Sequence, residues 1–363
     1  MEIRAPAAST RVNEIDLLRF FAALSVVFFH YSFRGYAADS MSVMPYPLLA
    51  PFSKYGFLGV ELFFMISGFV ILMTAASGSL RGFVVSRFVR LYPAFWACCT
   101  ITFAVTVAIG APRYSSSPGQ YLVNMTMLSG FVGVPSIDGA YWSLFVEMQF
   151  YAWVALVLAV RRIHQAELFV VSWLVASIVL EIEPVGKLRY LLMVDYSAYF
   201  IAGATCFLIW SRGWSPARLA VVALSWVLAV YQVTKGLPLF EEHFHTSISG
   251  YVVAGIITTF FVVLLLVSLR KTGAFGRRRW LLAGALTYPL YLLHENVGFM
   301  IFNVEYPRFN AHLVLWATLA AALASAYAVH VFVEKRFSPP IKNAIDNFLD
   351  QMRGLRMRAS GGA

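Results

Sequence analysis

The stretch IDLLRFFAALSVVFFH, residues Ile15–His30, decides the fold of this chain. It is apolar for most of its length, as a membrane span must be, yet it carries Asp16 and Arg19 near its start and His30 at its end. Arg19 and His30 are separated by close to three helical turns, or roughly 16 Å along a helix axis. Both side chains therefore leave nearly the same face of one predicted span.

Ionisable side chains at membrane depth are costly, and they usually face a protein interior or a watery cavity. His30 is thus either a structural residue, hydrogen-bonded to a neighbouring helix, or a functional group in a cavity. The stretch by itself does not decide between these interpretations.

The composition predicts an all-α polytopic membrane protein. Of the 363 residues 60% are hydrophobic and only 13% are charged, whereas soluble domains have about 25% charged residues. The spans use nearly the whole length, which leaves no room for a large soluble catalytic domain. The net charge of +10 indicates cytoplasmic loops rather than nucleic-acid binding. Cys98, Cys99 and Cys206 lie in apolar runs, so neither a disulfide framework nor a metal site is predicted.

Hydropathy predicts about ten spans in a transmembrane domain at 15–333, between a lead at 1–14 and a basic tail at 334–363. The tail is expected to form a surface helix that frays. The segment 112–140 is expected to be interfacial or re-entrant because its apolar part is short and interrupted by glycine. The predicted spans are about 15–33, 56–76, 93–111, 141–160, 167–180, 196–210, 217–233, 248–269, 280–302 and 312–333.

Ten spans place both termini on one side of the membrane. Lys and Arg favour that side by about three to one. The distribution predicts both termini in the cytoplasm of a multi-pass protein of the cell (inner or plasma) membrane, with membrane lipids around it.

In this topology four spans place titratable groups in the outer half of the membrane. They are His30, Glu61, Glu147, and the adjacent His294 and Glu295. We therefore expect a shared polar cavity. For Glu61 and Glu295 taken singly, an isolated interhelical hydrogen bond explains the residue at least as well.

A histidine beside a carboxylate suits general-base catalysis, because the carboxylate orients the ring and stabilises the imidazolium that forms. Two pairings are open, Glu147 with His30 and Glu147 with His294.

Arg87 and Arg90 lie on one side of a helical turn near the cytoplasmic face, with Arg19 at a similar height. Guanidinium groups match phosphate oxygens. Ordinary positive-inside charge would also explain this pair. The combination with His30, roughly 16 Å away, fits coenzyme A, which has a phosphate-rich head and a thin arm.

These residues carry a family likeness along nearly the whole chain. The chain resembles the acyltransferase-3 family of membrane O-acetyltransferases, which act on bacterial surface polysaccharides, Nod factors and macrolides. Its Arg-x10-His motif matches Arg19 to His30, and its RxxR motif matches Arg87 and Arg90. Four further fragments match in order: FFMISGF (63–69), YWSLFVEMQFY (141–151), YPLYLLHE (288–295) and VEKRFSPP around Glu334.

The resemblance implies an acyl-CoA donor on the cytoplasmic side and transfer to a hydroxyl, often on a sugar at the outer face. It implies that His30 is the base or acyl relay, that Arg19, Arg87 and Arg90 bind or gate the donor, and that Glu147 assists. His294 is a further candidate. Some members carry an SGNH-type hydrolase domain after the last span, and here we expect a scheme without one.

The predicted function is therefore acyl transfer, most simply of acetyl, from acyl-CoA to a hydroxyl of a carbohydrate or glycolipid acceptor. A proton-coupled secondary transporter is the main alternative, because intramembrane His and Glu residues also occur in such carriers. A non-catalytic scaffold would leave the buried ionisable groups unexplained.

Overall fold

The computed structural model describes residues 11–76 and 78–360. The first ten residues of the predicted lead and the last three of the predicted tail lie outside the described residues. The described part is helical, without strands, and nine of its helices are long and apolar enough to cross a membrane. The predicted all-α polytopic architecture is confirmed.

Nine of the ten predicted spans correspond to long helices. These are α1 (Asn13–Phe29), α4 (Gly59–Ala75), α5 (Leu80–Ile109), α7 (Trp142–Ala159), α8 (Ala166–Ile182), α10 (Val194–Arg212), α11 (Pro216–Phe244), α12 (Gly250–Ser268) and α16 (Ala311–Val329).

The remaining predicted span, 280–302, is a broken helix. Its two parts are α14 (Leu281–Leu293) and α15 (Glu295–Glu305), and His294 lies between them. Neither part alone has the roughly 20 residues that a span needs. The break places His294 and Glu295 in the interior of the molecule, where both are buried.

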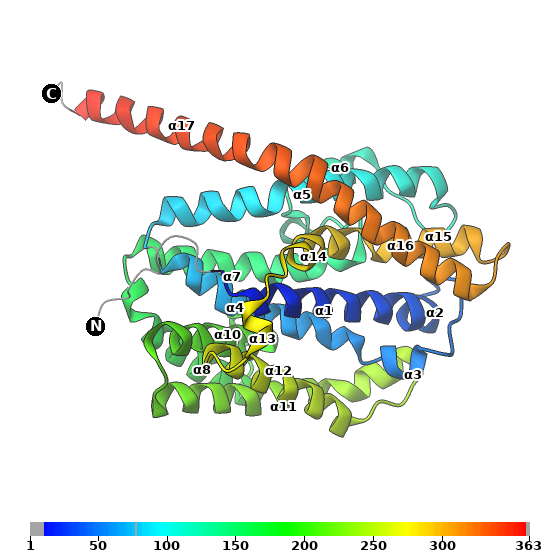
Figure 1. Ribbon diagram of the computed structural model, residues 1–363, viewed down its shortest axis with the longest axis horizontal. Helices are drawn as coiled ribbons and strands as arrows, with labels where there is room; N and C mark the ends of the chain where they lie inside the picture. The colour runs from blue at the N-terminus through cyan, green and yellow to red at the C-terminus, as the bar shows by residue number, and fades with distance from the viewer. Residues whose placement is uncertain (1–10, 77, 361–363) are drawn as a thin grey trace.

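α1 and α4 lie in the middle of the molecule (Figure 1). On one side are α8, α10, α11 and α12, and on the other are α5, α16 and α17 (Lys335–Ser360). The last of these extends beyond the bundle. Shorter helices complete the fold: α2 (Gly35–Ala37), α3 (Ala50–Ser53), α6 (Pro118–Asn124), α9 (Gly186–Leu191) and α13 (Ala274–Arg277).

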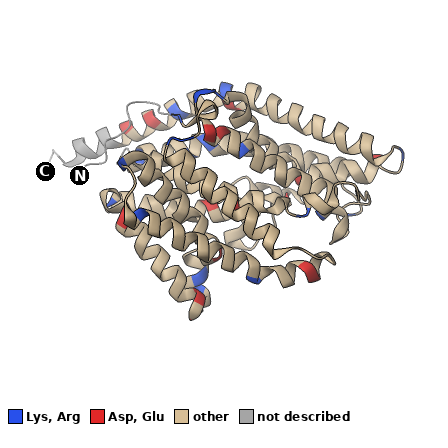
Figure 2. Ribbon diagram, turned by 60° about the horizontal axis from the view of Figure 1, so that its bottom comes forward, with Lys and Arg blue, Asp and Glu red and all other residues tan. Residues whose placement is uncertain are grey.

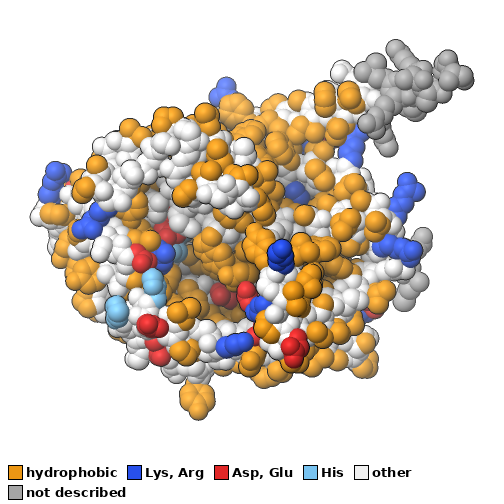
Figure 3. Space-filling view, turned by 180° about the vertical axis from the view of Figure 1, so that it is seen from behind, with side chains coloured by type: hydrophobic (Ala, Val, Ile, Leu, Met, Phe, Trp, Pro, Cys, Tyr) orange, Lys and Arg blue, Asp and Glu red, His pale blue; other side chains and the backbone are white. Residues whose placement is uncertain are grey.

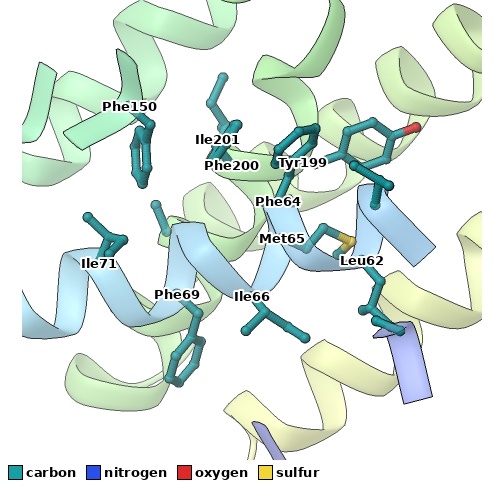
Figure 4. Close-up of a cluster of buried hydrophobic side chains, with 14 of the residues drawn as sticks. Leu62, Phe64, Met65, Ile66, Phe69, Ile71, Phe150, Tyr199, Phe200 and Ile201 are labelled. Carbon is teal, nitrogen blue, oxygen red and sulfur yellow. The ribbon is translucent and has the colours of Figure 1, made fainter. Parts of the chain in front are cut away.

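The tightest helix pair is α4 with α10, because glycines let the two backbones approach. A Cβ atom added to Gly68 would collide with the carbonyl oxygen of Phe200, and one added to Gly203 would collide with that of Met65. Small residues at a helix–helix contact are the usual means of close packing in membranes. Side chains of both helices, including Phe64 and Phe200, form the buried cluster in Figure 4.

Charged residues gather near the helix ends and along α17, and the middles of the helices are mostly uncharged (Figure 2). This distribution is expected for helices whose centres lie in hydrocarbon. The predicted tail is helical and continuous with α16, through a π-helical turn at His330–Glu334. Arg81 of α5 pairs with Asp346 and Asp350, which holds α17 against the bundle.

Candidate active site

His30 lies where α1 changes its winding. α1 ends at Phe29, and a π-helical turn continues from His30 to Arg34. Such turns occur frequently at functional sites. The turn directs both His30 and Arg34 toward Glu295. His30 is only 8% exposed.

The His30 ring is surrounded by polar partners. Its Nδ1 lies 2.9 Å from the carbonyl oxygen of Val26 and 3.0 Å from Nε2 of His294. Its Nε2 lies 3.3 Å from Oε2 of Glu295. The structure therefore brings together the two predicted histidines. It adds the carboxylate of Glu295, which the sequence explains at least as well by an isolated interhelical hydrogen bond.

His294 has a defined tautomer. Its Nδ1 lies 2.8 Å from the carbonyl oxygen of Tyr291, and only a protonated nitrogen can donate to a carbonyl. In the neutral ring Nε2 is then an acceptor, and it faces His30. From these partners we assign His294 as the acceptor for a hydrogen bond from Nδ1–H of His30.

Glu295 is held in place from several directions. It is 2% exposed, and Nη1 of Arg34 lies 2.7 Å from its Oε1. A Cβ atom at Gly139 would collide with the Glu295 carboxylate. The segment before α7 therefore leaves space for this carboxylate because residue 139 is glycine. Arg34 stabilises the charged form of Glu295, which an uncompensated buried site would disfavour.

Asp138 holds the backbone beside Glu295 in place through hydrogen bonds. Its carboxylate accepts hydrogen bonds from the backbone N–H groups of Ala140, at 3.0 Å, and Asn296, at 3.1 Å. It thereby fixes the start of α15 beside the loop before α7. Burial raises the pKa of the Asp138 carboxyl, and the charge of Glu295 acts in the same direction.

This cluster stabilises a protonated His30. When Nε2 accepts a proton, it gains the Glu295 carboxylate as a hydrogen-bond partner, while Nδ1–H keeps Val26 and His294. Both N–H groups of the imidazolium are then satisfied, and its charge faces a carboxylate. The arrangement suits a ring that takes a proton from a substrate hydroxyl.

Glu147 is placed elsewhere, and neither expected pairing of Glu147 with a histidine is formed. Its Oε1 accepts a hydrogen bond of 2.5 Å from Ser67, and it lines a cavity rather than the histidine cluster. The predicted pairing rested on the depth of each residue along its helix. Depth fixes the position of a residue across the membrane but not the direction in which its side chain points. The carboxylate beside His30 is Glu295.

The expected single cavity is also divided. Glu61 lines a different pocket, which lies between α4, α10 and α11. The titratable groups that the sequence places in the outer half of the membrane therefore belong to three sites: a histidine cluster, a cationic cavity and a separate pocket.

The cationic cavity has a volume of about 170 Å³ and collects the three predicted donor-binding arginines, Arg19, Arg87 and Arg90, with Glu147. A larger cavity of about 790 Å³ adjoins it and shares Arg19 and Arg90 with it. The larger cavity adds Arg11 and Lys335 to its lining. The two cavities share part of their lining, and we refer to them together as the basic passage.

The three arginines differ in their partners. Arg90 has a carboxylate, with its Nη1 3.2 Å from Oε1 of Glu334, and it lies over the ring of Tyr288. Arg87 contacts the hydroxyls of Ser86 and Thr74. Within the described part of the chain, Arg19 and Arg87 form no ion pair. Two guanidinium groups that line the cavity and form no ion pair with Glu147, which lines it too, are suited to an anionic ligand.

Tyr291 separates the cavity from the histidine cluster. It lines the cavity, and its hydroxyl lies 2.7 Å from Oγ of Ser143. Its ring centre is 5.5 Å from that of His294. The end of a ligand in the cavity would therefore meet Tyr291 before it reached His30.

Sequence reasoning missed the roles of Arg34, Asp138 and Tyr291. Arg34 had a usable signal, because it lies four residues after His30 and so on the same helical face. Tyr291 also had one, because it lies in the YPLYLLHE segment three residues before His294. Asp138 had none, since only the fold brings it to the start of α15. Among the described residues, no three His, Cys, Asp or Glu side chains are grouped so that they could hold a metal ion.

A family model described as an acyltransferase domain, Acyl_transf_3, matches residues 12–331. The chain belongs to the acyltransferase-3 family. With its apolar helices, this makes it a multi-pass membrane acyltransferase.

Three curated relatives are similar to parts of the chain. Nodulation protein 10 of Rhizobium leguminosarum bv. viciae is 29% identical over 195 residues, which is 46% of this chain and 51% of that protein. Peptidoglycan O-acetyltransferase OatA of Listeria monocytogenes is 30% identical over 160 residues, 39% of this chain and 23% of that protein. The O-acetyl transferase of Shigella phage Sf6 is 25% identical over 239 residues, 60% and 68% of the two chains.

The chain thus spans about half the length of the first of these relatives and less than a quarter of the second. No solved structure matches it. The names of the relatives support an O-acetyltransferase family.

Proposed function

We propose that this protein transfers an acyl group, most simply acetyl, from acyl-CoA to a hydroxyl of a glycan or glycolipid precursor. The observation that carries the proposal is the position of His30, between Glu295 and His294 and beyond Tyr291 from a cavity lined by three arginines.

The basic passage would hold the donor. Arg19, Arg87 and Arg90 would bind the phosphates of CoA, and the pantetheine arm would extend past Tyr291 toward His30. The span of roughly 16 Å between Arg19 and His30 supports this placement. The positive-inside distribution supports a cytoplasmic entrance for the passage.

The reaction would proceed at His30. The acceptor hydroxyl gives its proton to Nε2 of His30 as its oxygen attacks the thioester carbonyl. The C–S bond then breaks, and the CoA thiolate leaves and takes up the proton. Glu295 stabilises the imidazolium between these steps. An acyl-histidine formed on His30 before the acceptor arrives is the covalent version of the same scheme.

The test is acyl transfer by purified protein in proteoliposomes supplied with radiolabelled acetyl-CoA and bacterial surface glycans. Label in the glycan, with an equal amount of free CoA thiol released, is the expected result. Absence of acetyl-CoA binding would contradict the proposal. Movement of a solute coupled to protons would then favour the transporter alternative.

A further inference from the structure

A pocket separate from the cationic cavity lies between α4, α10 and α11. Its volume is about 210 Å³, and its lining includes Glu61, Gln232 and several aromatic rings. Neither the proposed donor passage nor the histidine cluster uses it. The pocket is large enough for one sugar ring.

Two acceptor atoms in this lining have no donor. Oε2 of Glu61 and Oε1 of Gln232 are shielded from solvent, and no donor among the described residues bonds to either. The orientation of Gln232 is fixed, since its Nε2 donates to Glu181 at 3.1 Å and to the carbonyl of Val194 at 3.0 Å. Buried acceptors without donors are unfavourable, and a ligand whose hydroxyl groups entered between these side chains would supply the missing donors.

Aromatic rings form the apolar walls of the pocket. Tyr196 packs against Phe64, with ring centres 5.1 Å apart, and against Trp142 at 5.6 Å. Phe57 and Phe240 pack against each other at 4.8 Å. A sugar offers apolar C–H faces to such rings and hydroxyl donors to carboxylate and amide oxygens.

The rim of the pocket is charged and faces water. Asp195 lines the pocket and its side chain is 65% exposed, and Lys235, next to the lining residue Gly236, is 56% exposed. Charged groups this exposed are expected to face water rather than hydrocarbon. In the predicted topology this end is the outer side of the membrane. Figure 3, which views the molecule from behind, shows a hollow in this face with acidic and basic side chains inside it and histidines near its edge.

Phe29 connects the pocket to His30. Its ring centre lies 5.9 Å from that of Phe57 and 6.4 Å from that of Phe240, two rings that line the pocket. The same ring lies 5.2 Å from that of His30. A ligand in the pocket is therefore separated from the proposed catalytic histidine by two layers of aromatic side chains, the lining rings of Phe57 and Phe240 and, behind them, Phe29.

We propose that this pocket is a sugar-binding subsite, in which Glu61 and Gln232 accept hydrogen bonds from ring hydroxyls and Tyr196 packs against the sugar face. The subsite would hold a sugar unit of the acceptor next to the unit whose hydroxyl reaches His30. This assignment rests on the proposed function for its role, but the binding site can be tested without any acyl transfer.

The test is saturation-transfer NMR with the full-length protein in nanodiscs and three oligosaccharide probes. The probes are a peptidoglycan-derived disaccharide, a chitin disaccharide and a rhamnose trisaccharide. We expect at least one probe to receive saturation from the wild-type protein. Binding should weaken about tenfold in Glu61→Leu, because a hydrogen bond between a sugar hydroxyl and the carboxyl group is lost.

Glu242→Leu is the matched control, because Glu242 is an exposed carboxylate in α11 outside the pocket. Tyr196→Ala tests the aromatic wall without removing an acceptor. Thermal unfolding of each variant shows whether it is folded. No saturation of any probe by the wild type, or equal saturation by wild type and Glu61→Leu, would overturn the assignment.

Kinetics separate the subsite from the proposed function. With an oligosaccharide that both binds and accepts acetyl, Glu61→Leu should raise the acceptor KM about tenfold and leave the acetyl-CoA KM unchanged. Sugar binding at Glu61 without acyl transfer would contradict the proposed function and leave the subsite standing. Transfer with an unchanged acceptor KM in Glu61→Leu would contradict the subsite alone.

Discussion

Glu295 is the residue whose role changes most between sequence and structure. The sequence predicts its neighbour His294 as a site residue and a pairing of Glu147 with a histidine. The structure instead places Glu295 between Arg34 and His30. That contact depends on the break between α14 and α15 and on the π-helical turn after α1, neither of which hydropathy reveals.

Replacement of Glu295 tests this residue directly. In Glu295→Gln the imidazolium of His30 loses its charged partner, so kcat should fall about 10²-fold while the acyl-CoA KM changes little. Glu147→Gln is the control carboxylate, and it should leave the His30 chemistry less affected. An equal loss of kcat in both variants, measured in the same transfer assay, would argue against a special role for Glu295.

The arginines of the cavity give a second prediction for single residues. Arg19→Gln and Arg87→Gln should each weaken CoA binding about tenfold, because each removes a guanidinium group available to a phosphate. Arg113→Gln, at an exposed loop position, should have no effect. Isothermal titration with CoA in detergent measures all three. Unchanged binding in both cavity variants would place the donor elsewhere.

At the scale of elements, the sequence predicts which segments form helices, but it does not predict which face of each helix turns toward which neighbour. Long apolar runs predict nine spans that overlap observed helices, because burial in lipid requires such runs. The bounds are less accurate, since α5 begins at Leu80 rather than near 93 and α11 ends at Phe244 rather than near 233. The direction in which a side chain points into the bundle depends on how its helix packs against the neighbouring helices. Glu61 and Glu147 were therefore assigned to one cavity, although α4 and α7 direct them to different ones.

The close contact of α4 and α10 predicts different outcomes for two glycine replacements. Gly203→Ala forces a methyl group against the backbone of Met65, so it should destabilise the protein by about 1–3 kcal/mol. Gly255→Ala in α12 is the matched change, because nothing lies within 4 Å of the added methyl group. Thermal unfolding in detergent compares the two. Equal melting temperatures would contradict the packing described for α4 and α10.

At the scale of the whole molecule, the proposed reaction requires two faces with different chemistry. A basic passage would open to the cytoplasm, and a sugar pocket would open to the outside. The family match and the helices support a multi-pass acyltransferase, but orientation in the membrane depends on the charge distribution alone. Composition gave the architecture, since a chain with so few charges has few soluble alternatives.

Cysteine accessibility tests the orientation. Cysteines placed at the exposed positions Lys187 and Arg278 should react from opposite sides of intact cells, Lys187→Cys with an impermeant maleimide from outside and Arg278→Cys only after permeabilisation. Cys98, Cys99 and Cys206 are buried, so the unmodified protein gives the background. The reverse pattern would invert the topology and place the basic passage outside.

The central claim is that His30 carries the acyl transfer. Its most direct test is acceptor-dependent release of CoA thiol from acetyl-CoA by purified His30→Ala protein, with CoA binding measured on the same sample. His164→Ala, at an exposed position, is the control. We expect that His30→Ala binds CoA normally and releases no thiol above background, while His164→Ala matches the wild type. Turnover retained in His30→Ala would contradict the catalytic role of His30.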